Sequence, residues 1–250
     1  MNLIRDYIIL GALQGFTEFL PVSSSGHLAL AQHILGIKEG QLALSVFMHL
    51  GTVCALFVFF FRDILATLKD PKTLLRLLLT TAITGCIGLA GKDIFEQLFS
   101  SPSAIAFSLL ITASLLIAAS RFMQGQRSDF SSTDALTLGL TQGLAVVPGI
   151  SRSGTTIATL LFRGLTRKRA FVVSFLAGLP AMAGAGLIEA RQITGIARAH
   201  PPAVICGFLS SFLCGIIALF FLRSALQKAR LQYLGYYCII VAIYTFVFIR

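Results

Sequence analysis

Charged residues are scarce in this 250-residue sequence. They make up only 12% of the chain, whereas apolar residues make up 56%. A soluble globular domain carries about 25% charged residues. The composition therefore excludes an ordinary soluble enzyme, a disordered chain and a nucleic-acid-binding protein. The net charge of +10 does not change this conclusion, because the basic residues lie between apolar blocks and form no continuous stripe. In a membrane protein, such a pattern reports orientation.

Motifs for metal binding and redox chemistry are also lacking. All five cysteines lie within apolar runs, no CxxC occurs, and no Cys/His cluster has the spacing of metal ligands. We expect these cysteines to be small packing residues. A cleavable signal is not expected either, because Asp6 follows Arg5 directly and no small-x-small site precedes Pro21.

Long apolar segments are abundant. A transmembrane helix needs about 20 apolar residues. The sequence predicts an all-α integral membrane protein, forming one membrane domain over residues 1–250. We expect six transmembrane helices, at Gln41–Phe61, Leu74–Ala90, Ser103–Ala119, Ala170–Leu187, Pro202–Phe221 and Gln232–Ile249.

Two further apolar segments are interrupted by polar and turn-forming residues. Leu3–Leu35 is broken at Pro21–His27, and Ala135–Phe162 is broken at Pro148–Gly154. Non-helical backbone at membrane depth is tolerated only where it is buried in protein or lines a polar cavity. The two breaks are therefore the expected location of the functional site.

The two breaks resemble each other in sequence. With an offset of 128 residues, QGFTEFLPVSSSG (Gln14–Gly26) aligns with QGLAVVPGISRSG (Gln142–Gly154) and is identical at five of thirteen positions. The matching residues are polar or glycine, which argues against chance similarity between apolar segments. We predict two internal repeats, at about residues 1–122 and 129–250.

Each repeat contains one broken segment followed by three predicted spans. Three crossings place equivalent positions on opposite sides of the membrane, as in the inverted repeats of several transporters. The return limbs, His27–Leu35 and Thr155–Phe162, are short, and at about 1.5 Å per residue each covers under half of the hydrocarbon core. This favours two re-entrant helical hairpins. Two kinked full spans, giving eight crossings, are the alternative.

The distribution of lysine and arginine predicts the orientation. With re-entrant hairpins, thirteen basic residues lie on one side of the membrane and six on the other, and Arg152 lies in the second break. The side with thirteen is expected to be cytoplasmic. Both termini and the mouth of the first hairpin then face the outer side.

Two ionisable residues lie deep within the interrupted segments. Glu18 is the one acidic residue well inside an apolar segment, and Arg152 is the one basic residue in a comparable position. Charges inside a membrane are costly and mark functional sites by default. We expect Glu18 and Arg152 to pair with each other or with a ligand between them.

The breaks also combine helix starts with serines. Ser23, Ser24 and Ser25 precede one apolar limb, and Ser151 and Ser153 flank Arg152 before the other. Serine caps helices, and free N–H groups at a helix start bind anions. Two such starts with an arginine predict a phosphate cradle. Glu18 and His27 complete an acid/base set for phosphoryl transfer, while His33 and His49 are expected to be packed, satisfied histidines.

The two motifs resemble the signatures of a known family. LQGFTEFLPVSSSGHL (Leu13–Leu28) and VPGISRSGTT (Val147–Thr156) are similar to the two motifs of undecaprenyl-diphosphate phosphatases of the bacitracin-resistance type. The similarity covers essentially the whole chain. It implies six spans and two re-entrant hairpins, the arrangement that the apolar pattern predicts independently.

The resemblance also implies roles for individual residues. Glu18 corresponds to the essential carboxylate, His27 to the catalytic imidazole, Arg152 to the diphosphate-binding arginine and Ser24 to a nucleophile or phosphate ligand. Gln14 takes a position that is Glu or Gln in the family. The supporting phosphate contacts implied are Ser23, Ser151, Ser153 and Thr156, and Ser25 joins them from its place at the helix start.

The resemblance further implies a divalent cation, Mg²⁺ or Ca²⁺. A single buried Glu18 holds such an ion only with oxygens from the substrate. The expected activity is hydrolysis of a polyprenyl diphosphate in the bacterial inner membrane, on the outer side, giving bacitracin resistance. A lipid-phosphate transporter or flippase is the alternative function. The sequence leaves the oligomeric state open, with a homodimer among the options.

Overall fold

The structure is a computed structural model, which describes residues 3–249 except 36–41, 100 and 200. The described residues form twelve α-helices and one 3-10 turn, with no strand among them and a single isolated bridge between Arg127 and Leu165. The helices are α1 (Leu3–Phe19), α2 (Ser24–Leu35), α3 (Leu42–Phe59), α4 (Phe61–Leu68), α5 (Pro71–Ala90), α6 (Lys92–Phe99), α7 (Pro102–Ala119), α8 (Ser132–Leu144), α9 (Arg152–Phe162), α10 (Arg167–Ala199), α11 (Pro201–Gln227) and α12 (Leu231–Phe248), with the 3-10 turn η1 at Ser120–Phe122.

The all-helical prediction is confirmed, and each predicted span lies largely within one helix, although α10 and α11 extend beyond the predicted bounds. Among the described residues, four helices are long and apolar enough to cross a membrane: α5, α7 with η1, α11 and α12. The bent pair Phe47–Phe59 and Phe61–Leu68 makes a fifth if it is one span. The count of six stays a prediction, because parts of Gln41–Phe61 and Ala170–Leu187 lie outside the described residues and side chains.

The predicted span Gln41–Phe61 ends earlier than expected. The chain bends by 73° between Phe59 and Phe61, and α4 continues in a new direction. No residue of α4 is buried, and its exposed apolar side chains Phe61, Leu65 and Leu68 lie on one helical face. A span predicted from hydropathy alone ends at the last apolar residue of the run. When a short surface helix with apolar residues follows the span directly, hydropathy does not separate the two helices.

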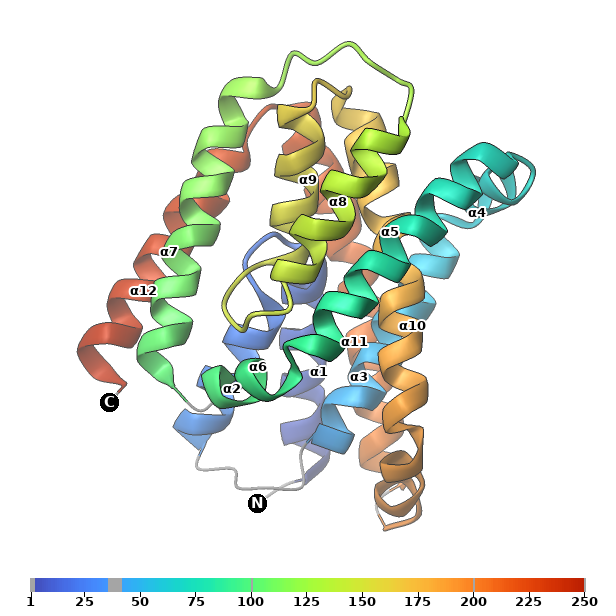
Figure 1. The fold of residues 1–250 in the computed structure, drawn as a ribbon. Helices are drawn as coiled ribbons and strands as arrows, with labels where there is room; N and C mark the ends of the chain where they lie inside the picture. Colours follow the sequence, from blue (N-terminus) through green and yellow to red (C-terminus); the bar gives the residue numbers. More distant parts are fainter. Residues whose placement is uncertain (1–2, 36–41, 100, 200, 250) are drawn as a thin grey trace.

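The two interrupted segments form helical hairpins that enter the bundle from opposite ends (Figure 1). Helices α1 and α2 have their outer ends beside the chain termini, whereas α8 and α9 descend from the other end, and the two turns meet at the middle of the molecule. The breaks fall where the sequence places them, since α1 ends at Phe19 and α2 starts at Ser24, while α8 ends at Leu144 and α9 starts at Arg152.

Close helix contacts hold the first hairpin in the bundle. Gly15 of α1 faces α11, where a Cβ atom on this glycine would lie 2.5 Å from the carbonyl oxygen of Ser211. Gly51 of α3 faces the same helix, and its Cβ would lie 2.6 Å from the carbonyl oxygen of Phe208. Small residues permit such close backbone approach in membranes, where lipid provides no hydrophobic driving force.

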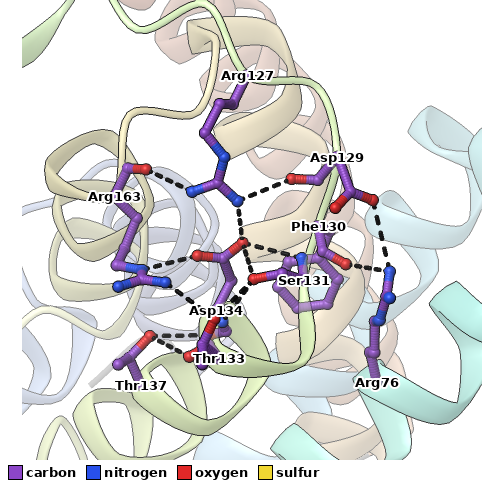
Figure 2. A network of polar contacts seen from close by, with 9 residues as sticks. All are labelled: Arg76, Arg127, Asp129, Phe130, Ser131, Thr133, Asp134, Thr137 and Arg163. Atoms are coloured by element: carbon purple, nitrogen blue, oxygen red, sulfur yellow. Dashed lines mark hydrogen bonds and ion pairs between the residues drawn. The ribbon is translucent and has the colours of Figure 1, made fainter.

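A buried carboxylate holds the second hairpin at its outer end (Figure 2). Asp134, near the start of α8, accepts hydrogen bonds from Arg127 Nη2 at 2.6 Å and from Arg163 Nε, at the end of α9, at 2.7 Å. Ser131 donates to the same carboxylate through its backbone N–H at 2.9 Å and its hydroxyl at 2.7 Å. The network ties both limbs of the hairpin to the loop before α8.

The hydrogen bonds control the ionisation of Asp134. Burial alone raises the pKa of this carboxyl, but hydrogen bonds from Ser131, Arg127 and Arg163 outweigh it and lower the pKa from 3.8 to about 2. A depressed pKa contributes stability that is present above the unfolded-state pKa and is lost as the pH falls toward the folded-state pKa. Asp134 therefore stabilises the fold at neutral pH, and this contribution fades between about pH 4 and pH 2.

We expect Asp134→Asn to lower the free energy of unfolding by about 2 kcal/mol at pH 7, because the ionised form gains this much from a shift of about two pKa units. Thermal unfolding of the protein in detergent measures the change. Asp129→Asn is the matched control, since Asp129 lies in the loop just before α8, is largely exposed and pairs with Arg76 at 3.5 Å. A gap between wild type and Asp134→Asn that stays constant from pH 7 to pH 2 would contradict this account.

Candidate active site

The first turn sets a short serine-rich loop at the middle of the molecule. Ser23 has a positive φ of 69°, a conformation that non-glycine residues seldom adopt and that is frequent at functional sites. Its hydroxyl accepts a hydrogen bond from the Gly26 N–H at 3.3 Å and lies 3.2 Å from the Ser25 hydroxyl. This geometry starts α2 at Ser24 and turns the Ser24 side chain toward α1.

The second turn has a comparable helix start. The Ser151 hydroxyl accepts from the Gly154 N–H at 3.1 Å and lies 3.4 Å from the Ser153 hydroxyl. Thr112 of α7 fixes this turn, because its hydroxyl donates to the Gly149 carbonyl at 3.0 Å and accepts from the Ser151 N–H at 2.9 Å. The equivalent serines therefore cap equivalent limbs in both hairpins.

Glu18 joins the two turns. Its Oε1 atom accepts a hydrogen bond from Arg152 Nη2 at 2.6 Å, across 134 residues of sequence. Its Oε2 atom accepts from the Ser24 hydroxyl at 2.6 Å and from Gln14 Nε2 at 3.0 Å. The carboxylate is almost completely buried. The predicted pairing of the two intramembrane charges is thus direct, and Ser24 shares the carboxylate with Arg152.

A cavity of about 140 Å³ opens beside this carboxylate. The site residues predicted from the sequence that line it are Glu18, Ser23, Ser24, Ser25, Ser151 and Arg152. The cavity is surrounded by serine hydroxyls, the start of α9 and the Arg152 guanidinium, and it has room for only a small group. Such a surface can hold a phosphate group, and Glu18 is placed to take the proton of the Ser24 hydroxyl.

Several predicted residues lie behind the cavity wall. Gln14 is buried against Glu18. Ser153 donates to the Leu20 carbonyl at 3.4 Å, which joins the two turns. Thr156 donates to the Arg152 carbonyl at 2.8 Å and lies 2.6 Å from the Ser174 hydroxyl. These three side chains support the site from within the protein.

His27 also makes its contacts away from the cavity. Its Nδ1 atom lies 2.8 Å from the Ser23 carbonyl, which can only accept, so Nδ1 carries the proton. Nε2 of the neutral ring then accepts from the Tyr237 hydroxyl at 2.8 Å. Within the described residues, His27 has no hydrogen bond to Ser24 or Glu18. In this conformation the imidazole fixes the backbone of the first turn.

The imidazole at the cavity belongs to His49 of α3. Its Nε2 atom lies 3.6 Å from Glu18 Oε2, and its side chain is 37% exposed and lines the cavity. From the sequence, His49 is expected to be a packed, satisfied histidine, so its position at the cavity is a difference from that expectation. No local motif surrounds it, and its place beside Glu18 depends on how α3 packs against the first hairpin.

Gly178 of α10 is a second residue that the sequence does not distinguish. A Cβ atom at this position would lie 1.9 Å from Arg152 Nη1, so any larger residue would force the guanidinium to shift from this position. Met182, one turn further along α10, places its sulfur 3.1 Å from Arg152 Nη2. Helix α10 therefore supports the face of Arg152 that points away from the cavity.

The described residues do not fit a resident metal ion. No group of three His, Cys, Asp or Glu side chains among them could hold one. Both oxygens of Glu18 already accept hydrogen bonds from Arg152, Ser24 and Gln14. A divalent cation would have to be held largely by phosphate oxygens of the bound substrate.

We expect Gly178→Ala to weaken binding of inorganic diphosphate at least tenfold, because the new methyl group displaces the Arg152 guanidinium. Gly184→Ala is the matched control in the same helix, since no atom lies within 4 Å of its added Cβ. Isothermal titration of both variants in detergent measures the affinities. Equal diphosphate affinities for the two variants would show that Gly178 does not set the position of Arg152.

Comparison with known proteins identifies the relatives of this chain. The family model described as bacitracin resistance protein BacA matches residues 7–244. An undecaprenyl-diphosphatase from Halothermothrix orenii is 40% identical over 248 residues, covering 96% of each chain. An undecaprenyl-diphosphatase from Carboxydothermus hydrogenoformans is 41% identical, covering 94% of each chain. One from Methanosphaera stadtmanae is 38% identical, covering 98% of this chain and 97% of the relative. The resemblance seen in the two motifs is confirmed along the whole chain, which belongs to the bacitracin resistance protein BacA family.

Proposed function

We propose that this protein is an integral membrane phosphatase that hydrolyses undecaprenyl diphosphate, or a similar polyprenyl diphosphate, to the monophosphate and inorganic phosphate. The observation that carries the proposal is the shared carboxylate of Glu18, which accepts from Ser24 and Arg152 at 2.6 Å each. A hydroxyl with an adjacent base and an adjacent cation is the arrangement that phosphoryl transfer to a serine requires. The names of the relatives support the same substrate.

In the first step, the Ser24 oxygen attacks the terminal phosphorus of the diphosphate. Its proton passes to Glu18 Oε2. The bond between the terminal phosphorus and the bridging oxygen breaks, and its electron pair leaves with the polyprenyl monophosphate, which departs as a dianion while Glu18 keeps the proton. Arg152 and the N–H groups at the start of α9 offset the negative charge that develops on the phosphoryl oxygens.

In the second step, water attacks the phosphoserine. Glu18 takes a proton from this water and returns it to the Ser24 oxygen as inorganic phosphate forms. We propose that His49 carries the proton that Glu18 gains in the first step to solvent, because its Nε2 atom lies 3.6 Å from the carboxylate and its side chain is more exposed than that of Glu18. Removal of the diphosphate form of the carrier lipid would give bacitracin resistance and return the carrier for cell-wall synthesis.

We further propose that the cavity opens toward the outer side of the inner membrane. The first hairpin has its ends beside both chain termini (Figure 1), and the other end of the molecule carries most of the basic residues. These positions support a cytoplasmic location for the second hairpin's outer end. The shared serine caps of the two turns support the inverted repeat of residues 1–122 and 129–250.

Phosphate release in detergent tests the function directly. Purified protein without a membrane should release phosphate from a polyprenyl diphosphate, and Glu18→Gln should release almost none, because it removes the base beside Ser24. The alternative function is a lipid-phosphate transporter, which has no hydrolytic step. In that case even the wild-type protein would release no phosphate. Absence of phosphate release by wild-type protein that binds the lipid would refute the proposal.

The nucleophile can be identified by trapping. If Ser24 attacks, Ser24→Ala should lose activity by at least a thousandfold, and wild-type protein quenched during turnover should carry labelled phosphate on Ser24. If water attacks directly, Ser24→Ala removes only a hydrogen bond to a charged group, about 1–3 kcal/mol, or about ten- to a few-hundredfold in rate. Phosphate release by Ser24→Ala within tenfold of wild type would exclude the covalent route.

The proton-transfer role of His49 predicts rescue by a small base. His49→Ala should lower kcat about a hundredfold, the usual contribution of one acid/base group. Added imidazole should restore part of the rate, because the space left by the missing His49 side chain opens into the active-site cavity. A purely structural role would show the loss without recovery. His49→Ala with at least half of the wild-type rate would remove His49 from the mechanism.

A further inference from the structure

A second cavity, of about 580 Å³, lies outside the active site and shares no lining residue with it. It is formed where the bend between α3 and α4 meets the first turn of α10 and the last turns of α11. This volume falls within the range of small-molecule sites, about 300–1,000 Å³. The mechanism of phosphate release uses none of its residues, so the cavity needs an explanation of its own.

The rim of the cavity is basic. Arg62, Arg167, Lys168 and Arg223 line it together with one carboxylate, Asp63, which leaves three net positive charges. Arg167 donates to the carbonyl oxygens of Gln227 at 2.6 Å and Leu226 at 3.3 Å, at the end of α11. In the part of the chain that the structure describes, the other three cations have no hydrogen bond or ion pair.

The floor of the cavity is aromatic. Phe60 and Phe171 are buried, and their ring centroids lie 5.2 Å apart. Phe59 contacts Phe171 at 6.1 Å and Phe220 of α11 at 5.0 Å. Phe220 is more than half exposed next to Phe59, which lines the cavity. The aromatic surface thus continues from the cavity floor to the outside of the bundle, where lipid chains pack.

The surface helix α4, which contributes to this cavity, is suited to lie at the level of the lipid head groups. After the 73° bend, α4 projects from the side of the bundle (Figure 1). Its exposed apolar face, Phe61, Leu65 and Leu68, is suited to the boundary between acyl chains and head groups. Arg62 and Asp63, on the same helix, then lie at head-group depth.

We propose that this cavity binds an anionic phospholipid. Its phosphate would be held by Arg62, Lys168 and Arg223, and one acyl chain would lie along Phe59 and Phe220. Basic pockets between membrane helices bind anionic head groups, because each basic residue near the membrane surface adds electrostatic attraction. A neutral lipid would interact with the aromatic floor alone. A free phosphate would interact with the basic rim alone.

The absence of tryptophan from the sequence makes the test specific. Phe59→Trp introduces a single reporter at the cavity, and brominated acyl chains quench tryptophan on contact. In phosphatidylcholine vesicles, brominated phosphatidylglycerol should quench this reporter at about five- to tenfold lower mole fraction than brominated phosphatidylcholine. Phe122→Trp is the matched reporter, since Phe122 is half exposed and adjoins Arg121, and it should show a preference below twofold.

Charge removal locates the effect. Arg62→Gln with Arg223→Gln should abolish the phosphatidylglycerol preference at Phe59→Trp, and both side chains are exposed, so the fold should tolerate the change. Lys72→Gln with Arg121→Gln removes the same charge outside the cavity and should leave the preference intact.

Equal quenching by the two lipids, or a preference that survives Arg62→Gln with Arg223→Gln, would overturn the proposal. Relief of phosphatidylglycerol quenching by millimolar inorganic phosphate would instead identify a free-phosphate site and likewise refute a lipid site. These measurements detect binding without turnover, so they stand whether or not the phosphatase proposal holds.

Discussion

The ion pair between Glu18 and Arg152 is the contact on which the centre of this protein depends. Each residue lies in the middle of an apolar segment, where a lone charge is very costly. Breaking a buried pair leaves one charge uncompensated and costs several kcal/mol, although a buried pair is not itself strong evidence of net stability. The pair therefore obliges the two hairpin turns to meet, and it also explains why the turns bring Ser24 beside the same carboxylate.

The surrounding structure holds each turn by a different means. The first turn is fixed by His27, whose ring nitrogens bind the Ser23 carbonyl and the Tyr237 hydroxyl. The second turn is fixed by Thr112 of α7. The outer end of the second hairpin is fixed by Asp134. Both turns are thus anchored mainly through backbone groups, whereas the side chains of Ser24 and Arg152 meet at Glu18. This arrangement leaves the central pair able to exchange its partners when a phosphate enters the cavity.

The similarity of the two hairpins in sequence contrasts with the difference in their chemistry. With the 128-residue offset, Ser24 of the first turn aligns with Arg152 of the second. Ser23 and Ser151 cap their limbs in the same way. Equivalent positions therefore supply a hydroxyl on one side and a cation on the other. Two similar scaffolds facing each other can hold a diphosphate asymmetrically, which hydrolysis of one of its two phosphates requires.

Hydropathy and spacing predicted most of the architecture. Because backbone groups cannot remain unsatisfied in lipid, long apolar runs must form helices, and interrupted runs must be buried within the protein. The same reasoning identified Glu18 and Arg152, since charges are conspicuous in apolar segments. It also located the serines at both helix starts. The position of α4 was missed, because a short amphipathic helix that follows a span continues its apolar run.

What the sequence determined by itself was the set of long apolar helices, the two breaks and the ionisable residues within them, since these follow from local composition and the solvation of backbone and charge. Tertiary structure decided which neighbours complete the site. His49 lies at the cavity because α3 packs against the first hairpin, Gly178 faces Arg152 because α10 crosses behind it, and Thr156 turns toward Ser174 and away from the cavity. Such contacts join residues far apart in the chain, and no local pattern records which helix faces will meet.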